Sequence, residues 1–176
     1  PDEFVAGRGV LPSGSGPENP MNTQQQLRLL QAIANAGLFR GITKTQALSV
    51  LSASTLKSYS TKTRVYSEGS NADEMLILLC GKLQLVGPSG KLMHGIHPGH
   101  TVGDFEVLAG ATHPADVIAT TTSRGLAIGV NTLREMFKAD PEMELVVLRN
   151  AMSACAGVMK KTSARPPEVA ERAVAA

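Results

Sequence analysis

The sequence MLILLCGKLQLVGPSG spans residues 75–90 and sets two apolar runs around one glycine, before a Gly-Pro-Ser-Gly turn. Short apolar runs bounded by such turn residues are typical of β-strands. Similar runs lie on both sides, and we predict strands over these ranges: 64–67, 75–80, 82–86, 92–96, 115–120 and 125–130. Several short strands at near-regular spacing favour a jelly-roll sandwich or barrel.

Two helices are predicted before this β-region. The first extends from about Thr23 to Ala36, and Gly37 is expected to end it. The second extends from about Lys44 to Ser54, with Thr43 as its N-cap. Leu38-Phe39 lies between the two helices and is expected to anchor the connection in the core.

Helical periodicity returns after the β-region. Asn131 or Thr132 is expected to cap a helix through Phe137, and Asp140-Pro141 suits the start of a last helix. That helix carries an apolar stripe at steps of three and four residues: Leu145, Leu148, Met152, Cys155 and Met159. The stripe has two interpretations: it docks on the chain's own barrel, or it pairs with a second copy or a neighbouring domain. The predicted fold class is mainly β with flanking α-helices, a β-roll barrel with N-terminal helices and a C-terminal helix.

The chain has 176 residues, 43% of them hydrophobic, which suits one packed domain with tails. We expect residues 1–20 to be a linker or a vector-derived tail, with Met21 as the natural start, although an interdomain tail stays open. The domain is expected over residues 21–161 and a flexible tail over residues 162–176. The two cysteines, Cys80 and Cys155, are expected as buried free thiols, and a disulfide between them stays open.

Charge and composition exclude some classes of protein. The net charge is +2 and aromatic residues make up 3%, so we expect no nucleic-acid partner. No apolar run has the length of a membrane span, so we expect a cytoplasmic protein. His94, His97, His100 and His113 do not share a strand face, and we expect turn and surface histidines and no metal site.

Several segments, taken in order, resemble the cyclic nucleotide-binding domain family with its catabolite activator-like β-roll. The resemblance covers roughly Leu38 to Asn150. It rests on these segments: Leu38-Phe39 with Gly41-Ile42, Tyr66-Ser67-Glu68-Gly69 with Ala72-Asp73, residues 75–83, Pro98-Gly99 with Val102-Gly103-Asp104, and Asp140-Pro141-Glu142. Each segment is weak evidence, but their order and spacing are specific.

The resemblance implies a phosphate-binding cassette for cAMP or cGMP over residues 103–117. In the family a glycine lets the backbone approach the phosphate, an acidic residue accepts the ribose hydroxyl, and an arginine and a small hydroxyl residue hold the phosphate. Here Gly103 matches, and Asp104 replaces the usual Glu. The ligand-binding residues implied are Val102, Gly103, Asp104, Phe105, His113, Pro114, Ala115 and Asp116.

Two departures weaken the implied site. His113 stands where the family has arginine, and loss of a charge-assisted phosphate contact costs about 1.5–3 kcal/mol, or roughly ten- to hundred-fold in affinity. Asp116 stands where the hydroxyl residue is expected and would repel a phosphate, and Pro114 removes one N–H donor. A carboxylate of Asp104 or Asp116 could restore part of the contact by holding His113 protonated.

Two functions follow from these patterns, and neither is enzymatic, because no catalytic arrangement stands out. The first is a regulatory cyclic nucleotide sensor that signals by movement of its C-terminal helix. The second is a degenerate cyclic nucleotide-binding fold without nucleotide, acting as a protein interaction or dimerisation scaffold. In both, the expected protein partner, or a second copy, binds through the C-terminal helix.

Overall fold

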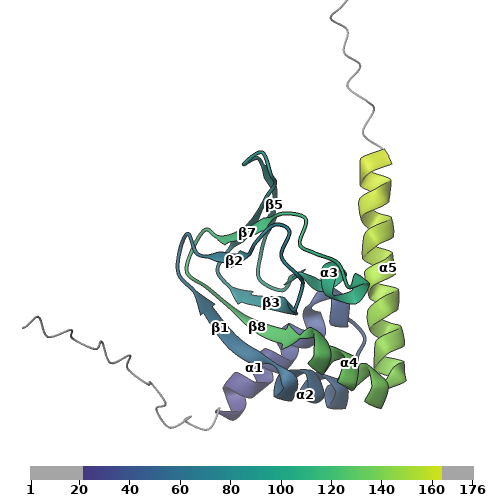
Figure 1. The fold of residues 1–176 in the computed structure, drawn as a ribbon. Helices are drawn as coiled ribbons and strands as arrows, with labels where there is room; N and C mark the ends of the chain where they lie inside the picture. Colours follow the sequence, from purple (N-terminus) through teal and green to yellow (C-terminus); the bar gives the residue numbers. More distant parts are fainter. Residues whose placement is uncertain (1–21, 164–176) are drawn as a thin grey trace, which may run out of the picture.

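The structure, a computed structural model, describes residues 22–163. The tail predicted over residues 1–20 lies outside these residues. The tail predicted over residues 162–176 begins two residues too early, because the last helix continues through Ser163, and its remainder lies outside the described residues. The predicted fold class is confirmed, because two antiparallel four-stranded sheets form a β-roll with helices at one end (Figure 1).

The helices and strands follow the order helices, β-roll, helices. The helices are α1 Thr23–Asn35, the 3-10 helix η1 Gly37–Phe39, α2 Lys44–Ala53, α3 Asp104–Ala109, α4 Val130–Ala139 and α5 Pro141–Ser163. The strands are β1 Thr55–Tyr59, β2 Arg64–Tyr66, β3 Glu74–Cys80, β4 Leu83–Val86, β5 Leu92–Ile96, β6 Thr101–Val102, β7 Asp116–Ala119 and β8 Ser123–Gly129. One sheet has the order β1-β8-β3-β6 and the other β2-β7-β4-β5.

Each predicted strand is present with ends shifted by at most two residues, but two strands were not predicted. β1 has the sequence TLKSY, which is largely polar, and its pairing with β8 defines it. β6 has two residues and pairs with Leu76 and Ile77 of β3. Both strands depend on a partner strand and not on local periodicity.

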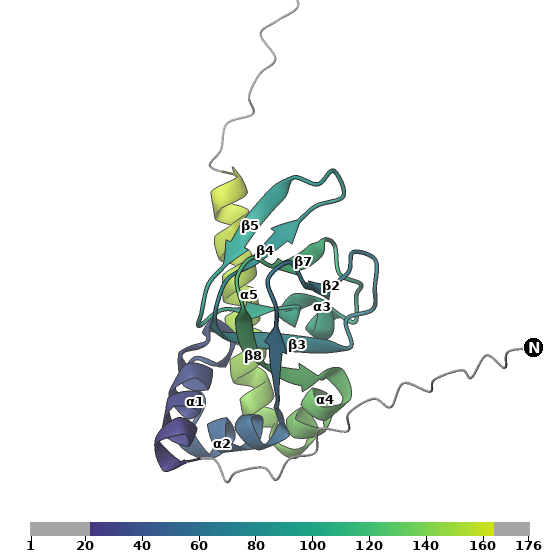
Figure 2. The ribbon, with the colours of Figure 1, turned by 90° about the vertical axis from the view of Figure 1, so that its left-hand side faces the viewer.

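The core has two parts. One lies inside the β-roll and includes Leu76, Leu78 and Leu83, each fully buried. The other lies between the β1-β8-β3 sheet and the helices, and is centred on Phe39 and Ile33. The helices α1, α2 and α4 therefore cover one end of the β-roll and leave the β4-β5 hairpin at the opposite end (Figure 2).

Helix ends were predicted with mixed success. Thr43 is confirmed as the N-cap of α2, because its hydroxyl accepts a hydrogen bond from the Gln46 N–H at 3.2 Å. In turn, Oε1 of Gln46 accepts a hydrogen bond from the Thr43 N–H. The prediction for Gly37 is wrong, because Ala36 caps α1 and Gly37 opens η1. The prediction of an Asn131 or Thr132 cap is also wrong: α4 begins directly at the end of β8, with no side-chain cap.

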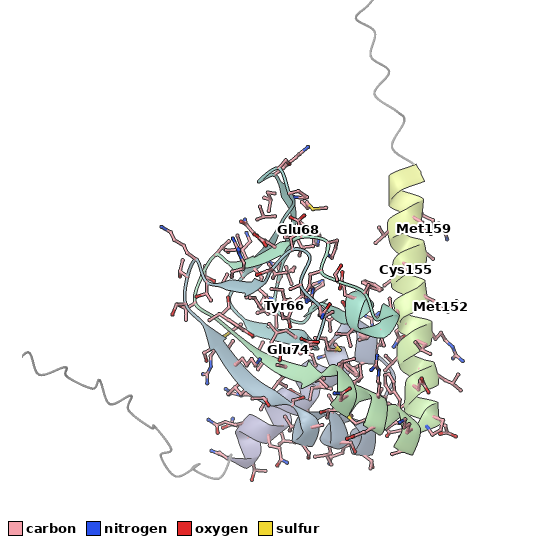
Figure 3. All side chains as sticks on the ribbon, in the orientation of Figure 1. Tyr66, Glu68, Glu74, Met152, Cys155 and Met159 are labelled. Carbon is pink, nitrogen blue, oxygen red and sulfur yellow. The ribbon has the colours of Figure 1, made fainter. Side chains whose placement is uncertain are left out.

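The prediction of buried cysteines is wrong. Cys80 and Cys155 are both free and exposed. Cys80 is the last residue of β3, where the strand leaves the core. Cys155 lies in the part of α5 that runs beside the β-roll, where every residue from 152 to 160 is exposed (Figure 3).

The last helix packs with a different face from the predicted stripe. Asp140 is confirmed as its N-cap, because the carboxylate accepts the Met143 N–H at 2.9 Å. Met143, Val147 and Ala151 are buried at steps of four residues. The Asn150 amide holds the helix by donating to the carbonyls of Leu38 and Arg40 at 2.9 and 2.8 Å.

The apolar stripe of α5 does not dock on the chain's own barrel, so that interpretation is wrong. Leu145 is 62% exposed, Leu148 39%, Met152 73% and Met159 69%. The stripe is rotated away from the buried face, and every residue from 152 to 160 is exposed. The labelled Met152, Cys155 and Met159 lie along the part of α5 that stands clear of the sheets (Figures 1 and 3).

Candidate ligand-binding site

The cassette predicted at residues 103–117 is a turn, a short helix and a loop between β6 and β7. Gly103 takes φ +77° and ends β6, and Gly110 takes φ +65° after helix α3. These left-handed angles favour glycine at both turns. The loop after α3 is pinned to the β2–β3 loop, because Gly69 N–H donates to the His113 carbonyl at 2.8 Å and His113 N–H donates to the Ser70 carbonyl at 2.9 Å.

Two stacked rings cover Gly103. The Tyr66 and His113 rings are parallel within 7°, with centroids 4.4 Å apart. A Cβ at Gly103 would lie 3.1 Å from Tyr66 Cε2 and 3.2 Å from His113 Cε1. His113 is only 3% exposed, so the prediction of a turn or surface histidine is wrong at this position. The imidazole at position 113, where the resemblance implies an arginine, is therefore part of the packed interior.

The two carboxylates expected to hold His113 protonated, Asp104 and Asp116, have other partners. Asp104, which is 7% exposed, accepts the Thr101 hydroxyl at 2.6 Å. Asp116 accepts the Glu68 N–H at 2.9 Å and lies 3.2 Å from Nη2 of Arg64. The hydrogen bonds of the described residues thus include none from either carboxylate to the imidazole, and they provide no support for the predicted rescue.

A buried tyrosine hydroxyl lies next to a half-buried ion pair. Tyr66 is 8% exposed and its hydroxyl has no hydrogen-bond partner among the described residues. Burial, and then the negative charge of Glu74, raises the pKa of Tyr66 well above its ordinary value. The same two causes raise the pKa of Tyr59 to about 12. Glu74 itself is held by Lys57, whose ammonium lies 2.6 and 2.7 Å from its two carboxylate oxygens.

A cavity of about 300 Å³ adjoins the ring pair. It is lined mainly by polar and aromatic side chains of β2, the β2–β3 loop, the start of β3 and the cassette: Val65, Tyr66, Ser67, Ser70, Asn71, Asp73, Glu74 and His113. The labelled Tyr66 and Glu74 lie inside the β-roll, while Glu68 lies toward the β7 side (Figure 3). The lining contains no arginine or lysine, so an anion entering it would meet carboxylates before any cation.

The predicted site residues divide into three groups. Gly103 and His113 come together at the ring pair. Val102 and Ala115 are buried, at 6% and 2% exposure, and serve the packing of the sheets. The remaining four are Asp104, bonded to Thr101; Asp116, bonded to Arg64; and Phe105 and Pro114, which are exposed.

Sequence reasoning missed four residues that contact or surround these groups. They are Arg64, Thr101, Lys57 and Glu74. Thr101 had a detectable signal, since a hydroxyl three residues before an acid can bond to it locally. The other three residues take part in two ion pairs, Lys57 with Glu74 and Arg64 with Asp116, and each pair joins strands that are separated in sequence. Among residues 22–163, no group of three or more His, Cys, Asp or Glu side chains is arranged to hold a metal ion.

Comparison with known families decides what this arrangement belongs to. Residues 56–140 match the family described as the cyclic nucleotide-binding domain. The chain therefore carries a domain of this family. Its cyclic nucleotide-binding domain contains both sheets from β1 onward, the cassette and helix α4, and it has the β-roll that the resemblance implied.

Solved structures share the fold at low identity. A cyclic nucleotide-binding domain from Methylobacillus flagellatus KT superposes with a TM-score of 0.67 at 14% identity, over 78% of this chain and 80% of that one. The N-terminal domain of a transcriptional regulator from Streptomyces coelicolor A3(2) gives 0.65 at 18% identity, over 74% and 94%. The regulatory domain of Toxoplasma gondii PKA with cAMP gives 0.62 at 19% identity, over 65% and 45%.

Curated relatives are much longer than this chain. An uncharacterized NTE family protein of Mycobacterium tuberculosis is 29% identical over 108 residues, which is 61% of this chain and 18% of the relative. The chain thus spans less than a fifth of the curated relatives it matches. None of the helices within residues 22–163 has the length and apolar character needed to cross a bilayer.

Proposed function

We propose that this cyclic nucleotide-binding domain is a non-enzymatic regulatory module that has replaced nucleotide binding with protein binding. The observation that carries the proposal is the Tyr66–His113 ring pair packed on Gly103. In the family an arginine and the glycine turn receive the phosphate, whereas here a buried pair of stacked rings lies against the same turn. The cassette is then a structural element that ties β6 and β7 to the β2–β3 loop.

Electrostatics supports the same conclusion. Among the described residues, Arg64 places its guanidinium at the cassette, where it forms an ion pair with Asp116 at 3.2 Å. Asp104, Glu74 and Asp73 all lie in or beside the site. An anionic phosphate would have to displace the Asp116 pair or face this negative charge, and both cost binding free energy.

The C-terminal helix supplies the binding surface in this proposal. Leu145, Leu148, Met152 and Met159 form an exposed apolar stripe on α5. Large exposed apolar side chains in a row are typical of protein interfaces, and their spacing suits pairing with another helix. The partner is a second copy of this chain or a domain of a longer protein.

Calorimetric titration with cAMP and cGMP at pH 6 and pH 8 tests the pocket. We expect no saturable heat with either nucleotide up to millimolar concentration. Saturable binding in the micromolar range would overturn the proposal, and stronger binding at pH 6 would assign the phosphate contact to a protonated His113.

Sedimentation at increasing protein concentration tests whether the stripe on α5 pairs with a second copy of the chain. We expect a concentration-dependent mass that Met152→Glu abolishes, because it places a charge in the middle of the stripe. Met93→Glu is the matched control, since Met93 is 62% exposed on β5. A monomer at all concentrations would exclude a second copy and leave a neighbouring domain as the partner.

A second candidate function is a cyclic nucleotide sensor. Gly103 keeps the left-handed turn of the cassette, and Asp104 keeps a carboxylate at the ribose position with one partner, Thr101. In this case His113 leaves Tyr66 when ligand enters, and α5 shifts between two positions. The same titration separates the two functions.

A further inference from the structure

A second cavity lies on the face of the β1-β8-β3 sheet that packs against the N-terminal helices. It measures about 490 Å³, is open to solvent on one side, and lies between α1, α2 and three strands. This volume is typical of small-molecule sites. Five leucines from five different elements line it: Leu29 of α1, Leu51 of α2, Leu56 of β1, Leu79 of β3 and Leu126 of β8.

The leucines form a floor and an open wall. Leu51 and Leu126 are 8% and 2% exposed and close the bottom of the cavity, whereas Leu56 is 49% exposed at its side. An apolar ligand in the cavity would remove Leu56 from water, which favours binding. No aromatic side chain lines the cavity, so it offers no face on which a nucleotide base would stack.

Two arginines stand at the rim. Arg28 of α1 and Arg124 of β8 both line the cavity and both are exposed. Within the described part of the chain, neither guanidinium lies in an ion pair, and no Asp or Glu lines the cavity. The remaining rim groups, Gln25, Ser54 and Cys80, are uncharged or weakly polar. The rim therefore complements an anion, while the interior complements a hydrocarbon.

We propose that this cavity binds a fatty acid, with the acyl chain on the leucines and the carboxylate between Arg28 and Arg124. A guanidinium holds a carboxylate by a fork of two donors. The site shares no residue with the cassette, so it stands whether or not the domain binds nucleotide. The domain would then have a second ligand-binding site, at the junction between the N-terminal helices and the sheet.

Calorimetry on the full chain with octanoic, decanoic and lauric acid, each below its micelle concentration, tests the proposal. We expect saturable binding that strengthens about fourfold for each buried methylene. Dodecyltrimethylammonium, which has the lauric chain length but a positive head, is expected to bind at least tenfold more weakly. Added salt should weaken the binding of lauric acid but not the binding of the cationic amphiphile.

Two variants assign the binding to this cavity. Leu56→Glu places a charge in the open wall and should lower the affinity for lauric acid at least tenfold. Leu92→Glu, at a 53% exposed leucine of β5, should leave that affinity unchanged. The double variant Arg28→Gln with Arg124→Gln should lower the affinity for lauric acid about fivefold or more. All four positions are exposed or half-exposed, so the variants are expected to fold, which circular dichroism checks.

Three results would overturn the proposal. They are absence of saturable binding by lauric acid to the unmodified chain, equal binding of the cationic amphiphile, and equal loss in Leu56→Glu and Leu92→Glu. The first result requires no variant, so a misfolded mutant cannot rescue the proposal.

Discussion

The rings of Tyr66 and His113 lie parallel, with centroids 4.4 Å apart, directly against Gly103. This contact brings together the end of β2, the cassette turn and the loop before β7. The resemblance implies an arginine at position 113, and the structure has a buried imidazole stacked on Tyr66 there.

Removal of the imidazole should destabilise the domain. His113→Ala leaves a cavity beside Tyr66 and loses the ring contact, so we expect the free energy of unfolding to fall by about 2 kcal/mol or more. Urea unfolding measures the loss. His94→Ala, at an exposed position of β5, should change stability by no more than about 0.5 kcal/mol. Equal effects at the two positions would show that the ring pair contributes nothing to packing.

Gly103 should tolerate a methyl group less well than Gly99. Both take a left-handed φ, +77° and +86°, so alanine strains the backbone at both positions by about 1–2 kcal/mol. Only at Gly103 would the new Cβ also press on the Tyr66 and His113 rings, since nothing lies within 4 Å of it at Gly99. We expect Gly103→Ala to lower the thermal midpoint clearly more than Gly99→Ala, and equal shifts would contradict the close contact.

Ionisation of the two tyrosines should be delayed by folding. The chain has two tyrosines and no tryptophan, so the ultraviolet signal of tyrosinate belongs to Tyr59 and Tyr66. Burial raises the pKa of Tyr59 from 10.0 to about 12, and the pKa of Tyr66 is raised as well. Because the folded-state pKa is the higher one, this contribution to stability is complete below pH 10 and is lost as pH rises toward 12.

An absorbance titration checks this. We expect little tyrosinate in the native chain at pH 10 to 11, and about half ionisation near pH 10 in urea, the unperturbed value. A native titration that matches the one in urea would show that neither ring is shielded.

The N-cap of α5 should respond to acid. Hydrogen bonds from the Met143 N–H and then from the Gln46 amide lower the pKa of Asp140 below its ordinary value of 3.8. Because the folded-state pKa is the lower one, this contribution is present above pH 3.8 and is lost as pH falls through the folded value.

Asp140→Asn should reduce that acid dependence, because the amide keeps an acceptor for Met143 but does not titrate. The measurement is the difference in urea midpoint between pH 6 and pH 3. Asp73→Asn is the control, since Asp73 is exposed and its side chain bonds to no described residue. If the difference in urea midpoint between pH 6 and pH 3 is the same in Asp140→Asn as in the unmodified chain, the Asp140 cap does not contribute to the acid response.

The order of strands and turns was predictable because it rests on local chemistry. Gly69, Gly81, Gly90 and Gly99 take left-handed φ angles at turns between the short apolar runs of the strands, and Gly103 and Gly110 take them at the two ends of helix α3. The caps at Thr43 and Asp140 were predictable for the same reason, since each bonds to an N–H three residues further on. Local patterns of this kind also carried the family resemblance.

Contacts between distant segments were decided only by the tertiary structure. Asp116 was expected to repel a phosphate, but its pairing with Arg64 and Glu68 depends on how β7 meets β2. The α5 stripe was apolar in sequence, yet Met143, Val147 and Ala151 fill the interface with the domain and turn the stripe outward. His113 was identified from its position in the cassette, but its burial against Tyr66 follows from the hydrogen bonds that pin two loops together. Spacing along the chain reports local geometry, whereas the neighbours of a side chain depend on which strands pair, and that is a property of the whole fold.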